Sequence, residues 1–320
     1  MLGKEFDMKK ILLIALALMT ALVFAACAGP AASDAPVAVA TLSGPTGMGM
    51  IKMFSDEAYD VTLLSNPDEI SPKIIGGEVQ VATIPSNLAA VIYNKTGGGI
   101  KTVAVNTMGV LYILENGDTV ESLADLAGKT IYATGQGATP EYVFQRILDE
   151  NGVKDVTIQF MGAHADLANA MAAGDVKLAL LPEPFVSTVL AKNSDVSVKI
   201  DVNEEWKAIF GEDAGIPMGV TVVTKDFAQN KAAMEKLIAD YSASVDYVVS
   251  DSEAAAADIA EAGIVASKEI ASSSIPRCGI SFSSGEACKA QLDDYFSVMF
   301  ESNPKSLGGA LPDESFYYMP

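Results

Sequence analysis

The stretch VAVATLSGPTGMGM, residues 37–50, decides the fold class. Its first six residues form an apolar, partly β-branched run of the length of a buried strand. A short turn rich in glycine follows, and residues 48–55 have the spacing of a helix. A strand that leads directly into a helix is the first half of a βαβ unit, so this stretch indicates an α/β protein.

The same step from strand to helix recurs along the chain. Helical patterns separate further short apolar runs, and strands are expected at residues 61–64, 79–84, 102–106, 111–115, 130–133, 156–160, 178–181, 196–200 and 219–224. Such alternation favours mainly parallel sheets covered by helices on both faces. Because the alternation starts again after residue 107, we expect two sheets of the same kind.

The last third of the chain has a different pattern. It is helical at residues 227–250, 252–262 and 286–300, with no further strand. Terminal helices without strands indicate that the chain has crossed back to pack against the first sheet. We therefore expect an α/β fold of two lobes with a ligand cleft between them. Lobe 1 comprises residues 37–107 and 219–320, and lobe 2 comprises residues 108–218.

The beginning of the chain has the layout of an export signal. Lys9 and Lys10 precede an apolar core too short for a comfortable membrane span, and small residues precede Cys27. This layout predicts a secretory signal peptide over residues 1–26. Residues 27–36 resemble the lipidation site and flexible tether of bacterial lipoproteins, which begin at an acylated cysteine. An ordinary signal peptide with an incidental cysteine is the alternative.

The composition is strongly acidic. Half of the residues are hydrophobic, and the formal net charge is -20. Residues 1–26 carry a net charge of +1, so the chain from Cys27 onward carries -21. Nucleic acid is not an expected partner, because phosphate binding needs a basic face and the chain has only two arginines, Arg146 and Arg277. Strong acidity indicates solubility and repulsion from other anionic surfaces.

Cys278 and Cys288 are the remaining cysteines, and nine residues separate them. In the oxidising compartment that the export signal implies, we expect them to form a disulfide. Closing that loop would stabilise the fold by about 2–3 kcal/mol. Two buried free thiols are the alternative. No metal site is expected, since His164 is the only histidine and lies far from both cysteines in sequence, and no cofactor is expected either.

Helix N-termini at the carboxyl ends of strands are the expected ligand site, because ligands of open parallel sheets bind in the crevice there. Four segments occupy such positions: residues 43–49, 85–87, 134–139 and 182–184. The third, with two glycines and two threonines around Gln136, is the strongest candidate and should form a polar jaw facing the first. The candidate ligand-binding residues are Gly44, Thr46, Gly47, Met48, Ser86, Asn87, Met108, Thr134, Gly135, Gln136, Gly137 and Glu183.

Several of these residues have structural interpretations too. Thr46 and Ser86 are suitable N-caps, and Glu183 is equally suited to an exposed rim. Residues 106–109 lead into the second lobe and residues 217–219 lead back. Their glycines would tolerate a hinge motion, as two-lobed proteins that close on a ligand require, but both would also fit ordinary turns. His164 is not a candidate ligand contact, because a lone histidine is more often a surface or capping residue.

Three motifs carry a resemblance to a known family. They are LAGKTI at residues 126–131, Ala-x-x-x-Gly-Asp-Val at residues 170–176 and LPEPF at residues 181–185. Their order and spacing, together with the lipoprotein-like start, resemble the solute-binding lipoproteins of ABC importers with a type II periplasmic-binding-protein fold. The most similar group is the nitrate, sulfonate, taurine and thiamine-precursor binders. The resemblance covers essentially the whole chain after Cys27.

This resemblance implies a function. The protein would be a monomer, lipid-anchored at the extracytoplasmic face of the cell membrane, that captures a small polar or anionic molecule by lobe closure. It would deliver that molecule to a membrane permease. In the family, the segment around Glu183 lies at the cleft mouth, where Glu183 would accept hydrogen bonds from a cationic or N–H-bearing ligand. Sulfonate or nitrate and a pyrimidine-type vitamin precursor both remain open as ligands.

The sequence also bears on two other classes of function. An enzyme is not expected, since the chain has no Gly-x-Ser-x-Gly elbow, no phosphate-binding loop and no His-Glu-x-x-His motif. The cysteine-rich metal motif of the fungal thiamine-precursor synthases that resemble this fold is also absent from the sequence. A lipid-anchored protein-binding or sensing ectodomain is the alternative, because it would have the same fold.

Overall fold

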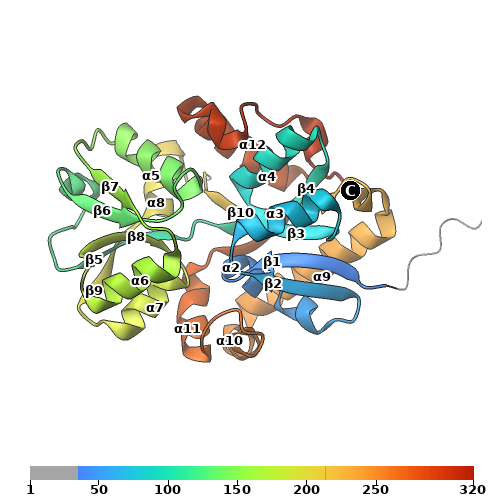
Figure 1. Ribbon diagram of the computed structural model, residues 1–320, viewed down its shortest axis with the longest axis horizontal. Coiled ribbons are helices and arrows are strands. Elements are labelled where there is room, and N and C mark those ends of the chain that lie inside the picture. The colour runs from blue at the N-terminus through green and yellow to red at the C-terminus, as the bar shows by residue number, and fades with distance from the viewer. Residues whose placement is uncertain (1–34, 213) are drawn as a thin grey trace, which may run out of the picture. The chain divides into compact units, whose positions relative to one another are not determined.

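The computed structural model describes residues 35–212 and 214–320, and Val37–Pro320 form one compact unit. The predicted signal peptide, Cys27 and nearly all of the predicted tether lie outside the described residues. In the part that the structure describes, no helix is long and apolar enough to span a membrane. The unit contains two β-sheets, each flanked by helices (Figure 1).

The first sheet has six strands in the order β2-β1-β3-β10-β4-β11. Its strands are β1 (Val37–Leu42), β2 (Tyr59–Leu64), β3 (Val81–Pro85), β4 (Ile100–Met108), β10 (Pro217–Thr224) and β11 (Ile280–Ser284). Strand β1 pairs in parallel with β2 and β3, whereas β10 lies antiparallel between β3 and β4. We refer to this sheet and its helices as lobe 1.

The second sheet repeats this arrangement with five strands in the order β7-β6-β8-β5-β9. Its strands are β5 (Leu111–Asn116), β6 (Thr130–Ala133), β7 (Thr157–Phe160), β8 (Leu178–Pro182) and β9 (Val196–Asp201). Strand β6 is parallel to β7 and β8, and β5 lies antiparallel between β8 and β9. In each sheet the strand that follows a crossing, β5 or β10, runs antiparallel to both of its neighbours, and β11 at the edge of the first sheet is antiparallel to β4 as well. The predicted fold of two α/β lobes is confirmed, and we refer to this second sheet and its helices as lobe 2.

Helices surround both sheets (Figure 1). Those of lobe 1 are α2 (Pro45–Gly49), α3 (Pro67–Gly76), α4 (Ser86–Thr96), α9 (Lys231–Ser250), α10 (Ser252–Glu261), α11 (Lys268–Ser274) and α12 (Gly285–Ser302). Those of lobe 2 are α5 (Thr139–Glu150), α6 (His164–Ala173), α7 (Phe185–Lys192) and α8 (Val202–Phe210). Between the lobes, α11 contacts α7 and α12 contacts α5.

The expectation of no strand after residue 224 was wrong, because β11 adds to the edge of the first sheet. Its five residues include three serines, and all five are only partly buried. Such a short polar run does not have the composition of a strand. It becomes one because β4 offers it hydrogen-bonding partners along an open sheet edge.

The predicted disulfide was also wrong, because Cys278 and Cys288 are both free thiols. Cys278 is fully buried, and its sulfur lies 3.7 Å from the sulfur of Met48. Cys288 is buried in a different hydrophobic cluster, with Leu292 of α12. Strand β11 runs between the two cysteines, so each thiol packs in its own apolar environment.

One hydrophobic core extends through both lobes. It contains Ala40 and Val220 of the first sheet as well as Ile113 and Leu180 of the second. Where the lobes meet, the Trp206 ring of α8 lies 5.8 Å from the Tyr295 ring of α12, measured between centroids. The lobes are therefore joined by continuous apolar packing in addition to the two crossing segments.

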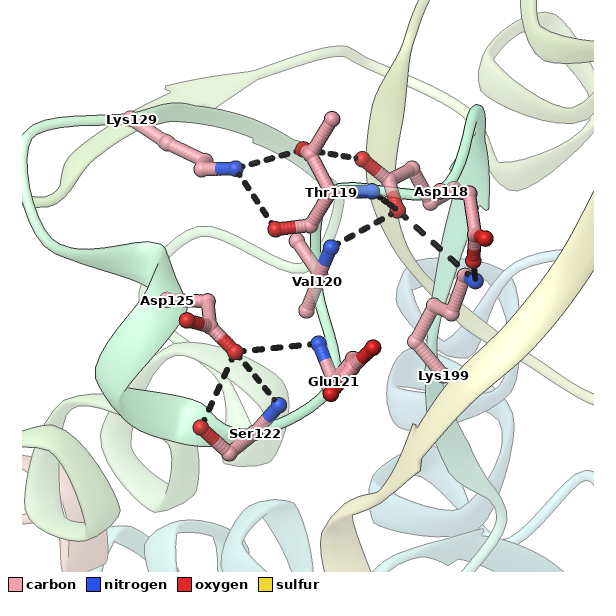
Figure 2. Close-up of polar contacts among 9 residues, drawn as sticks. Asp118, Thr119, Val120, Glu121, Ser122, Asp125, Lys129 and Lys199 are labelled. Carbon is pink, nitrogen blue, oxygen red and sulfur yellow. Dashed lines mark hydrogen bonds and ion pairs between the residues drawn. The ribbon is translucent and has the colours of Figure 1, made fainter.

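The connection from β5 to β6 is held by a buried carboxylate. Glu115, 5% exposed, accepts hydrogen bonds from the backbone N–H groups of Thr119 and Val120 at 2.9 and 3.0 Å. Lys199 lies 3.9 Å from that carboxylate and pairs with Asp118 at 2.6 Å (Figure 2). These bonds fix the start of the loop that leads to the short 3-10 helix η2 (Leu123–Leu126).

Candidate ligand-binding site

The helices that follow β1, β3, β6 and β7 begin without side-chain caps. The N-cap residues of α2, α4, α5 and α6 make no capping hydrogen bond through their side chains. By contrast, α3, α8, α9, α10 and α11 are capped by Asn66, Asp201, Asn230, Asp251 and Ser267. The first N–H groups of a helix have no partner within the helix, so the uncapped ends can donate to a bound molecule.

Two of these uncapped ends meet across the lobes. The Thr139 hydroxyl, at the start of α5, donates to the side-chain oxygen of Asn87, at the start of α4, at 3.1 Å. Both residues are buried. Ser86, also buried, donates to the carbonyl oxygen of Pro217 at 2.5 Å. The structure therefore brings the predicted residue Asn87 into contact with lobe 2, whereas the hydrogen bond of the predicted residue Ser86 to β10 stays within lobe 1.

Tyr295 of α12 lies beside this meeting point, and it is not among the residues predicted from the sequence. It is 2% exposed and its hydroxyl lies close to those of Ser86 and Thr139, yet no hydrogen bond of ordinary length and angle joins this hydroxyl to the described residues. Burial raises the pKa of the phenol, so the group stays a neutral donor. A buried hydroxyl without a partner costs about 1–3 kcal/mol. In the sequence, Tyr295 is indistinguishable from a core residue of an amphipathic helix.

The predicted jaw at residues 134–139 is only partly buried. The Thr134 hydroxyl is buried and contacts Nδ1 of His164, at the start of α6, whereas Gln136 and Gly137 are exposed and Gly135 is half-buried. His164 packs against Phe185 with ring centroids 5.3 Å apart. Burial lowers the pKa of His164 to about 4, so its ring is neutral at neutral pH.

Glu183 lies at the start of α7 and is 2% exposed. One carboxylate oxygen is 2.6 Å from Nε of Arg277, and the Ser187 hydroxyl donates to the same oxygen at 3.0 Å. The other oxygen accepts from the Ser187 backbone N–H at 3.0 Å. Burial raises the pKa of Glu183, while the bonds from Ser187 and Arg277 oppose that shift. The Glu183 carboxylate therefore accepts its hydrogen bonds from Ser187 of α7 and from Arg277 of lobe 1.

The segment around α2 contacts lobe 2 through backbone. Gly44 is buried with φ 107, and a Cβ there would lie 3.5 Å from Cδ of Pro184. The next turn is tight, since a Cβ on Gly47 would come within 2.6 Å of the Leu42 carbonyl oxygen. The Met48 side chain is fully buried. The predicted segments 43–49 and 182–184 thus meet between the lobes.

The crossing into lobe 2 is closely packed. The Met108 backbone N–H donates to the carbonyl oxygen of Gly279 at 2.8 Å, and Met108 itself is half-buried. A Cβ on Gly109 would collide with the Asn203 side chain. Close packing against Asn203 therefore requires glycine at position 109.

Two surface cavities lie away from these residues. One, of about 250 Å³, is lined by Tyr142 and Arg146 of α5 and by Ser302 of α12. The other, of about 230 Å³, lies on lobe 1 between Lys52 and Tyr247. Over residues 35–212 and 214–320, no group of three or more His, Cys, Asp or Glu side chains is placed to hold a metal ion.

Comparisons with known proteins bear on the family and the fold of the chain. A family model described as menaquinone biosynthesis matches residues 35–301. An ABC transporter structure from Parabacteroides distasonis superposes with a TM-score of 0.77 at 24% identity, over 89% of this chain and 99% of that one. The periplasmic aliphatic sulphonate binding protein SsuA from Escherichia coli superposes with a TM-score of 0.70 at 15% identity, over 90% and 93%.

A third structure, the alkanesulfonate-binding protein SsuA from Xanthomonas axonopodis pv. citri bound to MOPS, has a TM-score of 0.62 at 16% identity, over 84% and 94%. No curated protein sequence matches the chain. At these identities the structural likenesses concern the fold, which is the two-lobed fold of periplasmic binding proteins.

Proposed function

The chain belongs to the menaquinone biosynthesis family, and from that premise we propose that it is an extracytoplasmic solute-binding protein of an ABC importer. It closes its two lobes on a small molecule and delivers that molecule to a membrane permease. The observation that supports this proposal most directly is that the uncapped N-termini of α4 and α5, from different lobes, meet beside the Tyr295 hydroxyl, which has no hydrogen-bond partner among the described residues. The predicted lobe boundaries and the anchoring of the chain through Cys27 at the membrane surface are parts of this proposal.

The proposed site offers mainly hydrogen-bond donors. Helix N–H groups, the Tyr295 hydroxyl and one N–H of the Asn87 amide can bind acceptor atoms of a solute. The other amide N–H of Asn87 donates to the Ser306 carbonyl oxygen at 3.4 Å. Both guanidinium groups of the chain are engaged elsewhere, Arg277 with Glu183 and Arg146 with Glu150, each at 2.6 Å. Recognition would then rest on directed hydrogen bonds. A sulfonate or nitrate and a pyrimidine-type ring both carry suitable acceptors.

A thermal-shift screen of the chain from Val37 to Pro320 tests the proposal. Aliphatic sulfonates, nitrate, pyrimidine vitamins and amino acids would be the first compounds. A solute at a hundred times its dissociation constant stabilises by about 2.7 kcal/mol, which gives a visible rise in melting temperature. If no compound shifts the melting temperature, the protein-binding or sensing alternative gains support.

Tyr295→Phe tests the site itself. The variant removes only a hydroxyl that has no partner among the described residues, so the melting temperature without solute should not fall. Affinity for the solute found in the screen should fall about tenfold, the equivalent of one lost hydrogen bond. Tyr247→Phe is the matched control, because that hydroxyl donates to Asp258 at 2.8 Å on lobe 1, away from α4 and α5. Equal affinities of the two variants would remove Tyr295 from the site.

An enzymatic role is the second candidate, and the family description is the observation that favours it. The two functions differ in the fate of the bound molecule. After long incubation with substoichiometric protein, mass spectrometry should recover the solute unchanged if the protein only binds it. Conversion of the solute into a product would replace the transport proposal with a catalytic one.

A further inference from the structure

Glu183 and Arg277 connect the two lobes through one buried ion pair. Glu183 follows β8 in lobe 2, and Arg277 ends the short 3-10 helix η4 (Ile275–Arg277) in lobe 1. The Arg277 Nε lies 2.6 Å from the carboxylate, and its Nη2 donates to the Ser187 hydroxyl at 2.8 Å. The Glu183 side chain is fully buried, whereas 34% of the Arg277 side chain is exposed.

Lobe 2 fixes Glu183 independently of Arg277. Its carboxylate accepts two hydrogen bonds from Ser187, and its own backbone N–H donates to the carbonyl oxygen of Val110 at 3.0 Å. Val110 belongs to the segment that crosses between the lobes. The carboxylate therefore presents a fixed acceptor beside this crossing.

Both lobes hold the backbone around Arg277 on the other side of the same crossing. From lobe 2, the Tyr112 hydroxyl of β5 donates to the Arg277 carbonyl oxygen at 3.1 Å. From lobe 1, the Met108 N–H at the end of β4 donates to the carbonyl oxygen of Gly279 at 2.8 Å. Between them, Cys278 is fully buried against Met48. The guanidinium is thus held on a packed segment instead of a free loop, which reduces the entropy lost when it binds the carboxylate.

We propose that Glu183 and Arg277 form an interlobe latch that shifts the lobes toward the closed arrangement before any solute binds. The inference rests on the lobe closure of the proposed function. A charge-assisted hydrogen bond of this kind is strong. The latch is also asymmetric, because loss of the arginine would leave a buried carboxylate uncompensated in the closed arrangement. Loss of the carboxylate would leave a partly exposed guanidinium, at smaller cost.

The test measures the distance between the lobes without any solute. Spin labels would be attached at the exposed positions Lys95 of lobe 1 and Lys154 of lobe 2, after substitution by cysteine, in the Val37–Pro320 unit. The native cysteines are buried. Double electron–electron resonance then reports the distribution of distances. Arg277→Met should raise the ratio of open to closed molecules by at least about tenfold, and Glu183→Gln should raise it by less.

Controls separate the latch from general damage. Glu204→Gln removes a 2.7 Å ion pair with Lys207 inside lobe 2 and should leave the distances unchanged. Glu183→Gln keeps the shape of the side chain, so it serves as the informative variant if Arg277→Met does not fold. Unchanged distances in folded Glu183→Gln and Arg277→Met would overturn the latch. Since no solute is present in this experiment, a shift in distance supports the latch even if the transport proposal fails. Conversely, if the distances do not change, the latch is contradicted even when the screen finds a solute.

Discussion

Burial beside Phe185 lowers the pKa of His164 to about 4, against about 6.5 in an unfolded chain. Because the folded state binds the proton less readily, His164 contributes stability above pH 6.5 that is lost as the pH falls toward 4. The melting temperature of the natural protein relative to His164→Asn should therefore decrease between pH 7.5 and 4.5. An NMR titration of the ring with a midpoint near 6.5 would contradict this prediction.

A second prediction at the scale of single residues concerns the reactivity of the two buried thiols. Burial raises the pKa of Cys288 to about 12 and raises that of Cys278 too, so neither is a reactive thiolate at neutral pH. Iodoacetamide should label neither cysteine of the Val37–Pro320 unit in the native state and both after unfolding without reductant. Mass spectrometry counts the labels. If neither cysteine is labelled after unfolding, the two cysteines form a disulfide after all.

At the scale of secondary-structure elements, we predict that the connection between β5 and β6 depends on Glu115 (Figure 2). Burial alone would raise the pKa of Glu115, but hydrogen bonds from Thr119 and Val120 outweigh burial and lower this pKa. The stabilisation that the ionised Glu115 gives to the folded state is thus fully present above the pKa of Glu in the unfolded chain, about 4.3. It is lost as the pH falls through the lower pKa of Glu115 in the folded state. Glu115→Gln should reduce the free energy of unfolding by about 2 kcal/mol in urea titrations.

Asp118→Asn is the control for that connection. The Asp118 side chain is 90% exposed and pairs with Lys199 at the surface. Exposed ion pairs contribute little to stability, so the urea midpoint should hardly move. An equal loss in both variants would mean that the loop depends on its overall charge and not on the hydrogen bonds of Glu115.

The helices and strands also show which elements a local sequence pattern can predict and which it cannot. Strands β1 and β6 were predicted with the observed bounds, because their apolar runs are local and strong. Strand β11 was not expected, since its pairing with β4 and not its composition makes it a strand. Helices α8 and α11 were missed as well, because short helices carry few turns of periodic pattern.

At the scale of the whole molecule, the shared core predicts cooperative unfolding. The core includes residues of both sheets, and Trp206 of lobe 2 lies against Tyr295 of lobe 1. Trp206 is the only tryptophan, so its fluorescence reports one lobe while circular dichroism reports both. The two signals should give coincident urea transitions. Separate transitions would show that the lobes unfold independently and that the contact at Trp206 is weak.

The sequence by itself determined the fold class and the segments near which the lobes meet. Both follow from short-range patterns, in which strands lead into helices and small polar residues stand at the junctions. Ser86, Asn87 and Glu183 could therefore be named in advance as residues of these junctions. Their role as ligand contacts stays a prediction.

Only the tertiary structure decided which side chains meet. Glu183 pairs with Arg277 across 94 positions of sequence, whereas Cys278 and Cys288, close in sequence, pack in separate clusters. The physical reason is the distance in sequence over which each kind of information acts. Periodicity reports which face of an element is apolar, but a contact between lobes depends on how whole elements pack, and no local pattern records that. Arg277 and Tyr295 could be identified only once the folded chain placed them at the boundary between the lobes.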